Sequence, residues 1–317
     1  MNYIILIIGF ILLIKGADIF VDGASDIAKE FGIPSIIVGL TIVSLGTSAP
    51  ELAVSLISSL QGSNGITIGN VLGSNIFNTL MVLGLTSIIM PIVIKKTTVF
   101  KDYIVNILVT ISLLVLTFGR TLFNREPGLS RISGIILLIG CIAFTIYLIK
   151  VSKDESVDSE KDEKIKFIPS ILKILFGIIG IILGGNLVVN SASNIAYSFG
   201  LSDKLVGLTI VSIGTSLPEL VTSMIAATKG ENDIAIGNVL GSNIFNILLI
   251  LGVSSSISPI IISRALFVDI VFLIGISILL GIFMFKGKAE KLYIGRSKGL
   301  TLVLIYISYI IYIIFRN

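Results

Sequence analysis

Long apolar segments alternate with short polar connectors along the whole chain. Each segment is close to or longer than the about 20 apolar residues that a helix needs to cross a bilayer. The ten predicted spans cover about residues 3–24, 34–60, 66–90, 99–119, 129–150, 167–193, 203–228, 233–257, 265–285 and 299–316. The pattern therefore predicts an all-α polytopic membrane protein.

Four of these spans, the second, third, seventh and eighth, are interrupted by Gly, Pro and polar residues, and they carry two repeated blocks. The decapeptide GNVLGSNIFN occurs at 69–78 and again, unchanged, at 237–246. GLTIVSLGTSAPEL at 39–52 matches GLTIVSIGTSLPEL at 207–220 at 12 of 14 positions. A single offset of 168 residues superposes both pairs, so the chain consists of two copies of one unit.

Each copy holds five predicted spans, an odd number, so the second copy must enter the membrane from the opposite side. The chain is therefore predicted to be an inverted-topology repeat, an architecture that many secondary transporters share. The first repeat is expected to cover residues 1–150 and the second residues 167–317, joined by a charged linker at 151–166.

Composition removes several classes of function. The chain is 54% hydrophobic and 13% charged, a composition typical of a membrane protein. Its net charge is +4, but the basic residues lie in short connectors between apolar runs, which argues against nucleic-acid binding. It has no histidine, and Cys141 is its single cysteine, so imidazole ligands, thiolate clusters and intrachain disulfides are excluded. We expect no cofactor. No basic residue precedes the first apolar run, so no cleaved signal peptide is expected.

The distribution of Lys and Arg predicts the orientation in the cell membrane. If the amino terminus is outside, the inner connectors hold 15 of these residues and the outer ones six. Positive residues favour the cytoplasmic side, so both termini are expected outside and the central loop inside. The charged run at 153–164 has no EF-hand pattern, so we interpret it as a solvated linker rather than a calcium sensor.

The second span is expected to be broken in the middle. Pro50 has no N–H for the carbonyl of Gly46, so backbone carbonyls near Thr47 should leave the helical ladder and need other partners. The polar side chains of this span are three or four residues apart and share one face. They are Ser44, Thr47, Ser48, Glu51 and Ser55, repeated as Ser212, Thr215, Ser216, Glu219 and Ser223.

The third and eighth spans carry a second polar stripe with a spacing of four. Its members are Asn70, Ser74 and Asn78, repeated as Asn238, Ser242 and Asn246. Two glycines lie beside each stripe, Gly69 and Gly73 in one copy and Gly237 and Gly241 in the other. Small residues at this spacing let helices approach closely, which would bring the stripe near the glutamates.

Glu51 and Glu219 are the acidic residues of the repeated blocks, which contain no Lys or Arg. A lone carboxylate at mid-membrane costs about 2.5–3.5 kcal/mol, so the two must be protonated or must meet a cation. Two carboxylates balance one divalent ion, and oxygen ligands with flexible geometry favour calcium over magnesium. Hydroxyl, amide and carbonyl oxygens suit sodium at flanking positions. The competing interpretation is a pair of buried structural acids that share protons.

These paired Gly-Thr-Ser-x-Pro-Glu and Gly-Asn-x-x-Gly-Ser-Asn-x-x-Asn blocks resemble the α-repeats of the sodium/calcium exchanger family. The resemblance implies alternating-access antiport, with inward sodium driving calcium outward and the first and sixth spans sliding across the other eight. It implies that Glu51 and Glu219 bind both ions. By the same resemblance the ion ligands would also include the backbone carbonyls of Thr47, Thr215, Ser44 and Ser212, the side chains of Ser48, Ser74, Ser216 and Ser242, and the site-lining Asn78 and Asn246.

The chain departs from parts of this family. Asn246 stands where several relatives have Asp, which argues against potassium co-transport, and Gly73 and Gly241 stand where the proton-coupled branch has an acid. A calcium/proton exchanger that uses the same glutamates is the main alternative. A cation channel and an intramembrane enzyme are less favoured, because the symmetry is internal and the motifs lack His and Cys. No obligatory partner besides the lipid bilayer is expected, so a monomer should suffice.

Outside the motifs, the first span carries Lys15, Asp18 and Asp22, which are not duplicated in the second copy. Lys15 and Asp18 are three residues apart, a spacing at which opposite charges pair on a helix. We interpret these charges as structural.

Overall fold

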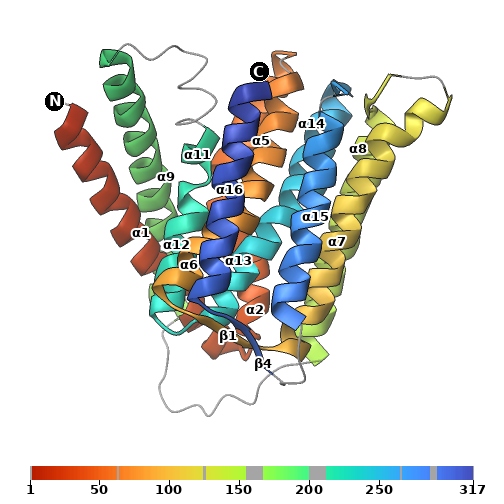
Figure 1. The fold of residues 1–317 in the computed structure, drawn as a ribbon. Helices are drawn as coiled ribbons and strands as arrows, with labels where there is room; N and C mark the ends of the chain where they lie inside the picture. The colour runs from red at the N-terminus through yellow and green to blue at the C-terminus, as the bar shows by residue number, and fades with distance from the viewer. Residues whose placement is uncertain are drawn as a thin grey trace.

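The computed structural model describes residues 2–62, 64–123, 126–154, 167–199, 212–264, 266–285 and 291–316, and the chain is mostly helical there (Figure 1). The helices of the first half are α1 (Asn2–Phe31), α2 (Ser35–Val38), η1 (Gly39–Val43), α3 (Ser44–Thr47), α4 (Ala49–Leu60), α5 (Asn64–Phe77), η2 (Asn78–Val82), α6 (Leu83–Ile89), α7 (Lys96–Phe118), η3 (Gly119–Phe123) and α8 (Arg131–Asp154). Those of the second half are α9 (Phe167–Ser198), α11 (Ser212–Thr215), α12 (Leu217–Thr228), α13 (Asn232–Phe245), η5 (Asn246–Leu251), α14 (Gly252–Ile257), α15 (Leu266–Phe285) and α16 (Arg296–Arg316).

Among the described residues, eight helices are long and apolar enough to cross a membrane, and one bent pair, Ser35–Thr47 with Ala49–Leu60, makes a ninth. The predicted span at 203–228 is described only from Ser212 onward, as the short helices α11 and α12. The prediction of a polytopic all-α membrane protein is confirmed, whereas the count of ten is not. In the predicted linker, α8 continues to Asp154, and the rest of the linker lies outside the described residues.

The helices lie side by side and cross the molecule in alternating directions (Figure 1). α1 begins and α16 ends at the same, upper side of the molecule. α2, which begins the first broken span, lies at the lower side of the molecule, and α11, which precedes α12 in the second, lies toward the upper side (Figure 1). The glutamate-bearing helices α4 and α12 therefore run in opposite directions, as an inverted repeat requires.

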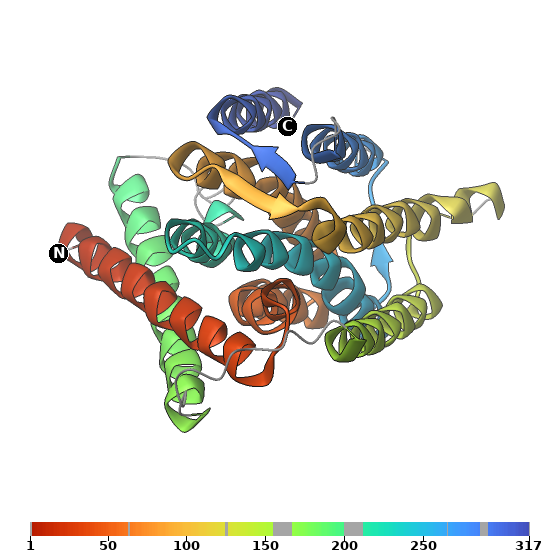
Figure 2. The same cartoon turned by 90° about the horizontal axis from the view of Figure 1, so that it is seen from below.

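Two long helices, α1 and α9, form a crossed pair at the edge of the molecule (Figure 2). Glycines line their contact: a Cβ on Gly16 would come within 2.6 Å of the Ile181 backbone nitrogen, and one on Gly177 within 2.6 Å of Phe20 Cβ. Small residues let the two backbones come this close, and van der Waals packing is the main force between helices in lipid.

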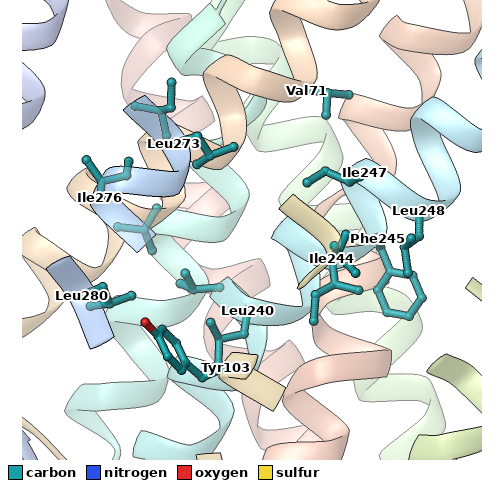
Figure 3. Close-up of a cluster of buried hydrophobic side chains, with 14 of the residues drawn as sticks. Val71, Tyr103, Leu240, Ile244, Phe245, Ile247, Leu248, Leu273, Ile276 and Leu280 are labelled. Atoms are coloured by element: carbon teal, nitrogen blue, oxygen red, sulfur yellow. The ribbon is translucent and has the colours of Figure 1, made fainter. Parts of the chain in front are cut away.

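α13 is the central helix. In the span Asn232–Ile257, which contains it, 94% of an 18-residue window is buried, against 22–39% for the spans of the outer helices α1, α7, α8, α9, α15 and α16. Helices that are apolar on every side but buried on only one leave large apolar side chains for lipid. Around α13 the interior is filled by aliphatic and aromatic side chains from α5, α7 and α15, among them Val71, Tyr103 and Leu273, which lie around Leu240 of α13 (Figure 3).

Two short antiparallel strand pairs join the connectors, and the sequence did not predict them. β1 (Ile92–Lys95) pairs with β4 (Lys291–Ile294), and β2 (Gly128–Leu129) pairs with β3 (Ile260–Ile261). β1 follows the third span of its repeat and β3 follows the corresponding span of the other repeat. The strand pairs therefore obey the internal symmetry and tie each repeat to the other.

Candidate ion-binding site

Both motif helices are broken where the sequence predicts. α3 ends at Thr47 and α4 begins at Ala49, and the helical stretches Ser35–Thr47 and Ala49–Leu60 are bent by 50° relative to each other. Ser48 occupies the break with φ −81° and ψ 6°, and Ser216 has nearly the same angles, −94° and 7°, between α11 and α12. A proline lies in the first turn of each following helix, a position where its missing N–H is not needed.

The breaks place each glutamate in the first turn of a new helix. Glu51 lies in the first turn of α4 and Glu219 in the first turn of α12. The amino end of a helix carries a partial positive charge, so each carboxylate is stabilised by the helix that bears it. Both side chains are fully buried.

The two repeats hold each other's glutamate. Ser48 of the first repeat donates to Glu219 Oε1 at 2.8 Å, and Ser216 of the second donates to Glu51 Oε1 at 3.0 Å. These partners are 171 and 165 residues apart in the chain. The bonds are reciprocal, so both carboxylates lie at the interface of the repeats.

Serines of the third and eighth spans complete a ring of hydroxyl groups around the two glutamates, which we call the ring; its members are Glu51, Glu219, Ser48, Ser74, Ser216 and Ser242. Ser74 donates to Glu51 Oε1 at 3.4 Å, and Ser242 donates to Glu219 Oε1 at 3.5 Å. The hydroxyl oxygens of Ser216 and Ser74 are 2.9 Å apart. Each carboxylate therefore uses one oxygen for hydroxyl donors, and Oε2 of both has no hydrogen-bond partner among the described residues.

Two asparagines fix the glutamate-bearing helices. Asn70 Nδ2 donates to Ser55 Oγ at 2.9 Å and to the Glu51 carbonyl at 3.3 Å. Asn238 does the same for Ser223 and Glu219, at 2.9 and 3.3 Å. The sequence predicted this polar stripe but assigned no role to Asn70 and Asn238. Their exact recurrence beside the glutamates was the available signal.

The threonines also cross between repeats. Thr47 Oγ1 donates to Asn238 Oδ1 at 3.0 Å, and Thr215 Oγ1 donates to Asn70 Oδ1 at 3.4 Å. Their hydroxyls are thus used for positioning, which leaves their backbone carbonyls as the groups predicted to meet an ion. That role stays a prediction.

The two serines expected to offer backbone carbonyls differ from this pattern. The Ser44 carbonyl accepts from the Ser48 amide at 3.0 Å, whereas the Thr47 hydroxyl, 3.3 Å away, has one proton and uses it on Asn238. One lone pair of the Ser44 carbonyl is therefore engaged by the helix. Ser212 begins α11, and its side chain lies outside the described residues.

Asn78 and Asn246 are buried, and each begins a π-helical segment, η2 and η5 respectively. Such segments are rare and occur often at functional sites. Both atoms of the Asn78 amide and Oδ1 of Asn246 lack a hydrogen-bond partner among the described residues. The sequence predicted both asparagines in the site but not the change of helix type.

The predicted close approach beside the glycines holds for one copy. A Cβ on Gly237 would come within 2.6 Å of the Ile36 carbonyl, so α13 packs directly on the first half of the broken span. At Gly69 the same atom would meet nothing within 4 Å. The glycine face of α5 instead borders a cavity of about 410 Å³, which Asp269 and Arg316 also line. For Gly69 the prediction was wrong.

The ring carries two formal negative charges and many neutral oxygens. None of the ion pairs of the described residues involves Glu51 or Glu219. Within the described ranges, no group of three or more His, Cys, Asp or Glu side chains could hold a metal ion. Carboxylate, hydroxyl and amide oxygens are the ligands that hard cations prefer.

The charges of α1 lie outside the ring. Asp18 and Asp22 pair with Lys229 Nζ at 2.8 and 2.6 Å, so Asp18 has Lys229 as its partner rather than Lys15. Asp26 pairs with Lys173 of α9 at 2.6 Å. Burial lowers the pKa of Lys229, but the hydrogen bonds and charges of the two aspartates outweigh it, so the pKa is raised.

Comparison with known proteins finds relatives that match most of the chain. The family model described as sodium/calcium exchanger protein matches residues 1–150 and 169–315. The sodium/calcium exchanger MaX1 of Methanosarcina acetivorans is 32% identical over 98% of this chain and 97% of its own. The inner membrane protein YrbG of Escherichia coli is 37% identical over 80% of this chain and 79% of its own.

Solved structures agree with the fold. The sodium-calcium exchanger NCX_Mj, soaked with zero Na+ and Ca2+, superposes with a TM-score of 0.84 at 35% sequence identity. The superposition covers 98% of this chain and 97% of that one.

Proposed function

Because the chain belongs to the sodium/calcium exchanger family, we propose that it is a secondary active antiporter that moves sodium inward and calcium outward. The observation that carries the proposal is the reciprocal pair of serine–glutamate bonds, Ser48 to Glu219 and Ser216 to Glu51. It joins two buried carboxylates from opposite repeats, with no basic side chain paired to them among the described residues. A cation is the partner that such a pair lacks.

In the calcium-bound state, Glu51 and Glu219 neutralise the ion through their Oε2 atoms, which have no hydrogen-bond partner among the described residues, and the carbonyls of Thr47 and Thr215 add neutral ligands. In the sodium-bound state, the hydroxyls of the ring join the carboxylates. These are Ser48, Ser74, Ser216 and Ser242. Asn78 and Asn246 supply amide oxygens at the same level of the molecule. The carbonyls of Ser44 and Ser212 are further ligands in this scheme.

Transport requires the site to face each side in turn, and we assign this movement to the pair α1 and α9. Their glycine-lined contact and the Lys173–Asp26 ion pair favour movement as one unit. The contacts of α1 with the rest include the Lys229 ion pairs with Asp18 and Asp22, which must open when α1 slides. The side of the molecule that holds Lys229 is the cytoplasmic side in this proposal, since positive residues concentrate there.

The decisive experiment is calcium-45 uptake into proteoliposomes loaded with sodium, then with potassium, then with an imposed pH gradient. Uptake from sodium-loaded vesicles alone is the expected result. Glu51→Gln keeps the size of the side chain but removes its charge, and it should abolish this uptake.

Uptake driven by the pH gradient alone would instead identify a calcium/proton exchanger, in which two protons neutralise the glutamates in place of calcium. Uptake that survives Glu51→Gln would mean that the ion binds elsewhere.

A further inference from the structure

Five buried polar side chains lie where α5–η2 meets α13–η5, and hydrogen bonds link four of them. Asn75 and Asn243 occupy the same position in the two identical decapeptides, and so do Asn78 and Asn246. The fifth member is Thr79, the first residue after the decapeptide, and its counterpart in the second repeat is Ile247. All five side chains are no more than 2% exposed.

A backbone carbonyl fixes the direction of one branch. Asn75 Nδ2 donates to the carbonyl of Asn243 at 3.0 Å, and a carbonyl can only accept. Asn75 Oδ1 must therefore be the acceptor for Asn246, whose Nδ2 lies 3.0 Å away. Since Asn246 uses its amide nitrogen here, its Oδ1 is turned away from Asn75 and has no partner in the described part of the chain.

The other branch does not mirror the first. Strict symmetry would put Asn243 Nδ2 on the Asn75 carbonyl and Asn78 Nδ2 on Asn243 Oδ1. Instead the Thr79 hydroxyl donates to the Asn75 carbonyl at 2.8 Å, and Asn243 Nδ2 donates to Thr79 Oγ1 at 3.0 Å. Ile247 has no hydroxyl and leaves the equivalent carbonyl, that of Asn243, to Asn75. Asn78 is consequently left with no hydrogen bond from either amide atom among the described residues.

We propose that Asn246 is held beforehand in its cation-binding orientation, that Asn78 is not held in this way, and that Asn75 and Thr79 are the positioning residues that create this difference. The proposal rests on the proposed function for the identity of the cations. Asn246 lies one helical turn beyond Ser242, which donates to Glu219, so the two residues share one face of the helix. A ligand already held in its bound orientation loses less conformational freedom on binding, and it therefore binds more tightly.

The test compares matched substitutions in the two identical decapeptides. Calcium affinity, and the sodium concentration that displaces half of the bound calcium, are measured on the purified full chain in detergent. Asn246→Ala should weaken at least one of these about fivefold more than Asn78→Ala does, because only Asn246 is held beforehand. Size-exclusion profiles and circular dichroism confirm folding, and Asn→Ser at both positions replaces any alanine variant that does not fold.

Thr79→Val keeps the size of the side chain and removes the hydroxyl. It should release the Asn75 carbonyl for Asn243, so that Asn78 becomes held as well. In this background the effects of Asn78→Ala and Asn246→Ala should become equal, whereas Thr79→Ser should keep them unequal. A merely structural role of Thr79 would weaken all variants without changing the ratio.

Equal effects of the two asparagine substitutions in the wild-type background would overturn the proposal, as would a larger effect at Asn78. An unchanged ratio with Thr79→Val would overturn the role of Thr79. These affinities do not depend on a sodium gradient, so a wild-type protein that binds calcium with the predicted asymmetry but does not exchange it for sodium would contradict only the proposed function.

Discussion

Replacing Gly237 with alanine should destabilise the protein, whereas the same change at Gly69 should not. The two glycines are the same residue of an identical decapeptide, and both lie inside a helix. A Cβ on Gly237 would lie 2.6 Å from the Ile36 carbonyl oxygen, 2.9 Å from Gly39 Cα and 2.9 Å from the Leu40 nitrogen. All three atoms belong to backbone, which cannot turn aside as a side chain can.

The expected size follows from two opposing effects. Alanine in a helix interior is favoured over glycine by about 0.5–1 kcal/mol, and this gain applies to both variants. Extra volume in a packed interior costs about 1–3 kcal/mol, and only Gly237→Ala incurs it. The free energy of unfolding of the two variants should therefore differ by about 1–3 kcal/mol, with Gly69→Ala equal to or above the wild type.

The chain supplies its own reporter for this measurement. Cys141 is the single cysteine and is buried, so a thiol-reactive dye becomes fluorescent only as the protein unfolds on heating in detergent. Gly237→Ala should lower the midpoint by a few degrees relative to Gly69→Ala. Equal midpoints would refute the argument, because they would mean that α13 is no more tightly packed than α5.

Three further predictions concern single side chains. Ser216→Ala removes the donor to Glu51 and should weaken calcium affinity about tenfold, since a hydrogen bond to a charged group contributes about 1.5–3 kcal/mol; an unchanged affinity in calcium titration would contradict it. Asp269→Asn breaks a buried bidentate pair with Arg316 and should lower the free energy of unfolding by about 3–5 kcal/mol. The double variant Asp269→Asn/Arg316→Gln should recover part of this loss, measured by the same thiol assay. Lys229→Met should cost about 1 kcal/mol or less, because its partners Asp18 and Asp22 are partly exposed. The raised pKa of Lys229 means that its contribution to stability is complete below its unfolded pKa of about 10.4 and is lost only above that. The difference in unfolding midpoint between the wild type and Lys229→Met should therefore be the same at pH 6 and at pH 9.

Much of the architecture was readable from local chemistry. Pro50 lacks an N–H in any fold, so the helix break beside Ser48 follows from the sequence alone. The exact repeat identified Glu51 and Glu219 together, and the odd number of predicted spans per copy gave the opposite directions of α4 and α12. Apolar segment lengths gave most membrane spans to within a few residues, but α1 continues to Phe31 and α9 to Ser198, beyond their predicted ends, and the region before Ser212 lies outside the described residues.

Contacts between the repeats were not readable in this way. The Ser48–Glu219 bond and the pairing of β1 with β4 join segments more than 150 residues apart, and nothing local favours one partner over another. The open glycine face of α5 and the packed face of α13 come from identical decapeptides. Their difference is set by what lies against each helix.

The sequence by itself determined a membrane-embedded inverted repeat with two paired glutamates, because apolar length, proline chemistry and internal identity act within a segment. Only the tertiary structure decided that each carboxylate is held by a serine of the other repeat, and that Asn78 and Asn246 differ. A hydrogen bond depends on where donors and acceptors meet in space, so two identical segments acquire different partners once a single unmatched residue, Thr79, stands beside them.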